Sequence, residues 1–177
     1  NIRTNTNATF LQNINVGVAI TAGKLGIGFT DTNVKIGNTA LDSLTTGTNN
    51  VGVGQEALTA STTGYRNVAV GTRAAKTITT GNSNVAIGYE ALEFTTTGSQ
   101  NVAIGHQALE ANTTADGNVA IGNAAMVSNT TGNNNIAIGA MALDANTTGS
   151  QSVAIGSNAL GSQNADVKNV AVGYRAL

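Results

Sequence analysis

The residues that could carry chemistry are few in this chain. His106 is the only histidine, and cysteine is absent. A nucleophilic or zinc site that relies on histidine would therefore have to use His106. Residues at multiples of seventeen from His106 are variable, which is typical of a solvated surface row: Gln55, Thr72, Tyr89, Asn123 and Ser157. We interpret His106 as a surface residue without a catalytic or metal-binding role.

Four glutamates are the other candidates for catalysis. Glu56, Glu90, Glu93 and Glu110 could pair for glycoside hydrolysis, which needs two carboxylates at a defined separation. Such residues more often provide surface charge. Glu56, Arg73 and Glu90 are also seventeen residues apart, so in a stack of equal coils Arg73 would lie between two carboxylates. We therefore expect surface ion pairs here and no enzyme activity.

Asparagine recurs at the same spacing. Asn67, Asn84, Asn101 and Asn118 each precede an apolar motif, and their amide oxygens could bind calcium. The surrounding Asn and Thr residues are neutral, whereas calcium sites use carboxylates. We favour amides that hydrogen-bond to one another along a stack. The Gly-x-x-x-Gly pattern is not a phosphate loop, because no helix or Gly-Lys-Ser/Thr follows it. We expect no cofactor and no metal.

These residues belong to a repeat of constant length. The motif Asn-Val-Ala-Ile-Gly, with small variations, recurs nine times at intervals of seventeen residues without insertion or deletion. A fixed short period is the mark of a repeat architecture, in which equal units stack. We number the repeat from position 0, which is occupied by Val34, Val51, Val68, Val85, Val102, Val119, Ile136, Val153 and Val170.

Each repeat predicts one coil of a parallel β-solenoid. The Val-x-Ile pair at positions 0 and 2 suits a short strand, and the glycine at position 3 indicates a corner with positive φ. Ala-Leu at positions 6 and 7 predicts a second short extended segment, and Thr-Thr-Gly before the motif predicts a turn. No window has the apolar spacing of a helix. The expected fold class is all-β, with nine seventeen-residue coils.

The Val/Ile pair is the predicted core of the coil. One coil would bury about three large apolar side chains, worth roughly 5–9 kcal/mol, whereas ordering each residue costs about 1–2 kcal/mol in backbone entropy. A coil therefore folds only when it is stacked on its neighbours, about 4.8 Å apart. The expected core includes Val68, Val70, Val85, Ile87, Val102, Ile104, Val119 and Ile121.

The alanine column at position 1 is predicted to lie at an interface between subunits. Side chains alternate along a strand, so position 1 points away from the Val/Ile pair. A uniform alanine row indicates a second packed surface, because a narrow coil has little core for its surface. The alternative is that alanine lines another layer of the same coil. Lys35 and Gly52 occupy the position in the first two repeats. The column predicted for a parallel homotrimer is Ala69, Ala86, Ala103, Ala120, Ala137, Ala154 and Ala171.

The chain divides into two parts. Residues 1–30 lie outside the period and contain two apolar stretches, at 16–20 and 25–28. We interpret them as an irregular β segment that caps the stack or leads into it. Residues 31–177 form the solenoid array. Because the chain begins at Asn1 rather than methionine, we expect it to be part of something longer.

Composition excludes several classes of function. Charged residues make up 10% of the chain and the net charge is −1, so nothing favours binding to nucleic acid or to an anionic membrane surface. No apolar run approaches the length of a membrane span, and we expect no membrane insertion within this segment. The lack of cysteine excludes a disulfide framework.

The repeat resembles a known family. Gln151-Ser152-Val153-Ala154-Ile155-Gly156 is similar to the signature in the heads of YadA-like trimeric autotransporter adhesins. The resemblance implies a left-handed parallel β-roll in a parallel homotrimer. The period here is longer than the usual head repeat of that family. The form Thr-Thr-Gly-x-x-Asn-Val-Ala-Ile-Gly-x-x-Ala-Leu, over 31–177, looks more like arrays in bacteriophage tail fibres, and Gly26-Ile27-Gly28 resembles regions that precede them.

Three functions are compatible with these expectations. The leading hypothesis is a structural and adhesive fibre module, part of a bacteriophage tail fibre or virion appendage that attaches to a glycan or protein receptor on the host. The second is the head of a bacterial trimeric adhesin. Both hypotheses place the chain outside the cell, on a virion or a bacterial surface. The third is an ice-binding solenoid, but adjacent Thr-Thr pairs point to opposite faces and a flat Thr-x-Thr array is missing.

Overall fold

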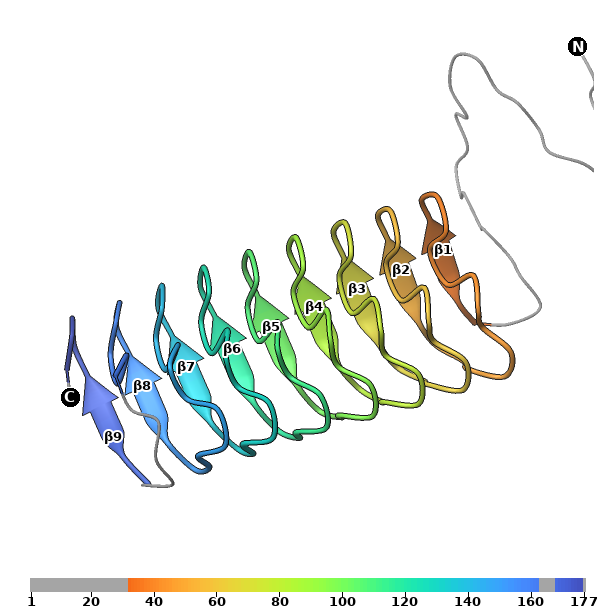
Figure 1. The fold of residues 1–177 in the computed structure, drawn as a ribbon. Coiled ribbons are helices and arrows are strands. Elements are labelled where there is room, and N and C mark those ends of the chain that lie inside the picture. Colours follow the sequence, from red (N-terminus) through yellow and green to blue (C-terminus); the bar gives the residue numbers. More distant parts are fainter. Residues whose placement is uncertain (1–31, 163–167, 177) are drawn as a thin grey trace, which may run out of the picture.

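The computed structural model describes residues 32–162 and 168–176, so the predicted entry segment at 1–30 lies outside the described residues. Nine short strands in the described part stack in sequence order into one sheet, with one strand in each coil (Figure 1). We call coil n the residues from the start of strand βn to the start of the next strand, which are seventeen in coils 1 to 8, and coil 9 is residues 170–177. The strands are β1 (Val34–Ile36), β2 (Val51–Val53), β3 (Val68–Val70), β4 (Val85–Ile87), β5 (Val102–Ile104), β6 (Val119–Ile121), β7 (Ile136–Ile138), β8 (Val153–Ile155) and β9 (Val170–Val172).

The register of the sheet follows the sequence period. Each strand pairs in parallel with the strand one coil later, so Val68 lies beside Val85 and Val85 beside Val102. Hydrogen bonds between coils continue beyond the strands. For example, the Leu58 backbone N–H donates to Ala74 O at 3.1 Å. The predicted fold class, an all-β parallel solenoid with seventeen-residue coils, is confirmed.

The second wall of each coil is a tight turn, and the prediction of an extended Ala-Leu segment was wrong. Glu90 and Leu92 have φ of 58° and 54°, in the left-handed region. Each such residue is strained by about 1–2 kcal/mol, so stacking on the neighbouring coils must hold it in place. The turn directs consecutive residues inward, because Ala91 and Leu92 are both 0% exposed.

The interior of the solenoid is built from alanine and leucine, and the predicted Val/Ile core was wrong. Val70 and Ile87 are 37% and 38% exposed, whereas the alanine column is at most 5% exposed. The expected alternation along the strand is present, but its two faces are reversed. The half-buried or exposed residues on the outer side include Val68, Val70, Val85, Ile87, Val102, Ile104, Val119 and Ile121. The alanines inside the coils, and therefore not at a subunit interface, are Ala69, Ala86, Ala103, Ala120, Ala137, Ala154 and Ala171.

The narrow width of the coil explains this reversal. In coil 2 the alanine column holds Gly52, and a Cβ added there would lie only 3.1 Å from Leu41 Cγ. The space between the strand and the leucine wall is thus about one methyl group deep, and valine or isoleucine does not fit into it. Alanine lines a layer of its own coil, which is the alternative considered above. Lys35 occupies the position in coil 1, where it forms an ion pair with Asp42.

The asparagines that precede the strands form a buried ladder. Asn84 Oδ1 accepts a hydrogen bond from the Asn101 backbone N–H at 3.0 Å, and Asn101 Nδ2 donates to Ala115 O at 2.8 Å. Asn101 Nδ2 also lies 3.2 Å from Asn84 Oδ1. The prediction that these amides bond along the stack is confirmed. The hydrogen bonds of each amide replace those that it would make to water, and they offset the free-energy cost of burying it.

Candidate functional site

The charged side chains of coils 2 to 5 form an ion network along one edge of the solenoid. Arg73 lies between Glu56 and Glu90, as the period predicts. Its Nε is 3.9 Å from Glu56 Oε2, and its Nη1 donates to Glu90 Oε1. Lys76 adds a second cation beside Glu56, with 2.7 Å between Nζ and Oε2. These contacts confirm the predicted stacking of Arg73 between two carboxylates.

Glu93 was not expected in this network, although its side chain is the most buried of the ion-paired group. That side chain is 2% exposed, and its Oε1 lies 2.5 Å from Arg73 Nη2. Position 8 of the repeat holds Lys76, Glu93 and Glu110 in three successive coils. This second charged column was the signal in the sequence that could have identified Glu93 and Lys76 as members of the network.

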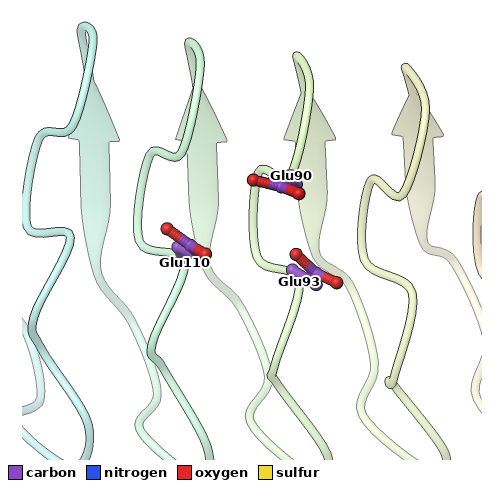
Figure 2. Close-up of side chains that lie close together, drawn as sticks. All are labelled: Glu90, Glu93 and Glu110. Carbon is purple, nitrogen blue, oxygen red and sulfur yellow. The ribbon is translucent and has the colours of Figure 1, made fainter.

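Three carboxylates of the network lie close together. Figure 2 shows Glu90 and Glu93 on one coil and Glu110 on the next, and one oxygen from each lies within 4.8 Å of the others. Carboxylate oxygens are the ligands that Ca²⁺ prefers. Here, however, Arg73 pairs with both Glu90 and Glu93, and Gln107 Nε2 donates to Glu90 Oε2 at 3.1 Å. These contacts support an internal ion network between coils as the chemical role of the group.

Burial raises the pKa of two of these carboxyls. For Glu93, burial is the main cause, the charge of Arg73 opposes it and the charge of Glu90 adds to it. For Glu110, burial is again the main cause of the raised pKa, and the charges of Glu90 and Glu93 follow. In contrast, the hydrogen bond from Lys76 lowers the pKa of Glu56. The four carboxylates of the network outnumber its two cations, so repulsion between carboxylates adds to the effect of burial on the two raised pKa values.

Replacing Glu110 by Gln should stabilise the folded chain at neutral pH. A carboxyl whose pKa is raised by folding contributes stability that is complete below its ordinary pKa, 4.5, and is lost as the pH rises through the raised value. Removal of the charge stacked on Glu93 should increase the free energy of unfolding by about 0.2–1 kcal/mol at pH 7. At pH 4 the change should be smaller. Urea denaturation at the two pH values measures both quantities.

The matched control for this prediction is Asp144→Asn. Asp144 occupies position 8 in coil 7, where the same position of the adjacent coils holds Val127 and Gly161. Because no carboxylate is stacked at that position, the substitution should change the free energy of unfolding at pH 7 by less than about 0.5 kcal/mol. Equal stabilisation by Glu110→Gln at pH 4 and pH 7 would contradict the electrostatic explanation.

His106 lies in an exposed row beside the network. Its ring stacks on Tyr89 with 5.5 Å between centroids and 13° between planes. On the other side, Asn123 Nδ2 lies 3.3 Å from His106 Nδ1. Both neighbours occupy the same repeat position in the adjacent coils. The predicted surface row is confirmed, and the contacts of His106 hold this row together.

The outer side of the sheet carries an apolar strip, which we call the Val/Ile face. It consists of positions 0 and 2 of the nine strands, which lie in one row along the solenoid (Figure 1). Position 2 is 50% exposed at Ile36, 37% at Ile138 and 38% at Ile155. A continuous exposed apolar strip is typical of surfaces that other molecules cover. Sequence reasoning identified these residues but placed them inside the coil.

Comparison with protein-family models found no matching family, and searches of curated proteins and of solved structures found no match either. Among the described residues, none belongs to a helix long and apolar enough to cross a membrane. The ion network and the Val/Ile face are therefore interpreted from their own geometry.

Proposed function

We propose that this chain is a structural and adhesive fibre module that assembles as a parallel homotrimer through its Val/Ile face. The observation that carries the proposal is the placement of the β-branched residues. The two largest apolar residues of each strand lie on the outer side, while strands β3 to β9 contribute only alanine to the interior. This distribution suits a chain that completes its hydrophobic core by association.

The small interior of the single chain supports association. A typical coil buries alanine at positions 1 and 6 and one leucine, such as Ala103, Ala108 and Leu109 in coil 5. Burial of one leucine contributes about 1.5–3 kcal/mol, which is small against the entropy cost of ordering seventeen residues. If a partner covered positions 0 and 2, every coil would bury two more large apolar side chains.

The period of the Val/Ile face supports a second copy of the chain as the partner. The face repeats once per coil over all nine strands. A partner that matches every row must have the same spacing, and a parallel copy of the chain has it by construction. Parallel copies around one axis form a closed cyclic assembly. The number of three copies comes from the resemblance of Ser152-Val153-Ala154-Ile155-Gly156 to trimeric head repeats.

The adhesive role is proposed for the outer edges of such a fibre, against a glycan or protein receptor. A bacteriophage tail fibre or other virion appendage is the setting that we favour, and the head of a bacterial trimeric adhesin is the alternative. The complete reading frame distinguishes them: virion-attachment sequences would support the first, and a C-terminal membrane anchor the second.

Ice binding is a less favoured alternative. Within each Thr-Thr pair the two hydroxyls differ: Thr96 Oγ1 donates to Thr113 O at 3.1 Å, and Thr97 is exposed. In coils 2 to 7 only the second threonine of each pair is exposed, which gives a single threonine column, whereas a flat ice-binding array needs two. A thermal hysteresis measurement tests this alternative.

The test of the proposed assembly is the molar mass in solution. The wild-type chain should have about three times the chain mass of 17.6 kDa in light scattering at micromolar concentration. The double variant Ile87→Glu and Ile104→Glu places charges on the Val/Ile face of two adjacent coils. Loss of two buried isoleucines per chain should weaken association by at least about tenfold for each substitution, while circular dichroism of the chain stays β-type.

The matched control carries the same two charges on another face. Thr97 and Thr114 are exposed in the same two coils, and Thr97→Glu with Thr114→Glu should leave the molar mass unchanged. A wild-type chain that is a stable monomer at micromolar concentration would overturn the proposed assembly.

A further inference from the structure

Three asparagines at position 10 of successive coils begin acceptor sequences for N-linked glycosylation. Asn-x-Ser/Thr normally marks a surface loop. In this chain, the asparagines are inside the solenoid at 0%, 0% and 3% exposure, whereas the threonines that complete the sequences are exposed. The acceptor sequences are Asn112-Thr113-Thr114, Asn129-Thr130-Thr131 and Asn146-Thr147-Thr148.

The amide nitrogens that would carry the glycan are used by the fold. Asn129 Nδ2 donates to Gly132 O at 3.0 Å, and Asn146 Nδ2 donates to Gly149 O at 3.0 Å. Asn146 Nδ2 also donates to Asn129 Oδ1 at 3.0 Å, which links two coils. Asn112 Nδ2 lies 3.2 Å from Thr95 Oγ1. A glycosylated amide nitrogen keeps only one N–H, so a modified Asn146 could not keep both of its bonds.

The interior at this position has no space for a sugar. A Cβ added to Gly132 would lie 2.5 Å from Asn129 Oδ1, and one added to Gly98 would lie 3.0 Å from Asn112 Nδ2. Even a methyl group is therefore in contact with these amides. A sugar, which is many times larger, would have to displace the backbone of the neighbouring coil.

We propose that N-glycosylation and folding exclude each other in coils 5 to 7. The asparagines concerned are Asn112, Asn129 and Asn146. In the unfolded chain, an N-glycosyltransferase joins the amide nitrogen to the anomeric carbon of a glycosyl diphosphate donor. The bond from that carbon to the diphosphate breaks, the diphosphate leaves with the electron pair, and the amide loses one proton. In the folded chain the acceptor nitrogens are inaccessible to the enzyme. In a chain that is modified first, the affected coil cannot fold.

The test is cell-free synthesis of the full chain with a soluble N-glycosyltransferase and a uridine-diphosphate sugar. The enzyme and donor are present during synthesis in one arm and are added after folding in the other. Peptide mapping by mass spectrometry follows the three sites and separates them from Asn7-Ala8-Thr9, which lies outside the described residues. We expect sugar on the three asparagines only in the first arm, and loss of protease resistance in the modified fraction.

Three variants make the result decisive. Thr97→Asn creates an exposed acceptor with Gly98 and Ser99 and should be modified in both arms. Thr114→Ala, Thr131→Ala and Thr148→Ala together should abolish modification of the three asparagines. Ala103→Glu, which should prevent folding of the coils, should be modified at all three sites even when the enzyme is added after synthesis.

Two outcomes contradict the proposal directly. The first is modification of the three asparagines in the folded chain at the level of the exposed acceptor. The second is a modified chain that keeps native protease resistance. Failure to modify the three sites in an Ala103→Glu chain that circular dichroism shows to be unfolded would also overturn it, because folding would then not be the cause of protection.

Discussion

Ala103→Glu should unfold the solenoid. Ala103 is 0% exposed in the interior wall of β5, where the corresponding space in coil 2 is about one methyl group deep. A carboxylate placed there has no room and no counter-charge, and burial of an unpaired charge is among the most destabilising single changes. We expect a loss of about 4 kcal/mol or more, seen as loss of β-type circular dichroism and of a cooperative thermal transition.

Two control substitutions isolate the cause of this effect. Thr114→Glu adds the same charge to an exposed position of the same coil and should change stability by less than about 0.5 kcal/mol. Ala103→Gly empties the position without adding charge and should cost about 0.5–1 kcal/mol. If Ala103→Glu folds with wild-type stability, the inward placement of the alanine column is wrong.

Gly122→Ala should be among the most damaging single-methyl changes in the array. Gly122 has φ of 138°, and an added Cβ would lie 2.5 Å from Gly139 O and 2.6 Å from Gly139 C. Both atoms belong to the backbone of the next coil, which cannot move without breaking the ladder. Backbone strain of about 1–3 kcal/mol adds to this clash, so we expect a total loss of about 3 kcal/mol or more in urea denaturation.

Gly52→Ala is the matched control for the glycine corner. It adds the same methyl group two residues before the corner of coil 2, at the position that is alanine in coils 3 to 9. The nearest atoms are Leu41 Cγ at 3.1 Å and Cδ1 at 3.3 Å, in a side chain that can adjust. We expect no loss of stability, or a gain of up to about 1 kcal/mol. A cost at Gly52 equal to that at Gly122 would contradict the role of the corner.

The seventeen-residue period determined the coil and its register. Equal spacing of Val68, Val85 and Val102 is compatible with one in-register parallel stack, and the pairing in the sheet follows it. The same period placed Arg73 between Glu56 and Glu90, as their contacts confirm. Glycine at position 3 also predicted the corner with positive φ, since other residues avoid that conformation.

Which side of the strand faces inward was decided by the tertiary structure. Alternation shows that Ala103 and Ile104 point to opposite sides, but it does not tell which side is interior. The usual preference for burying the larger apolar residue favoured Ile104. In the fold, consecutive left-handed turns direct both Ala108 and Leu109 inward, and this wall leaves room for alanine alone. The width of the coil is set by the packing of the turn against the strand. It therefore cannot be read from the residues of a single repeat.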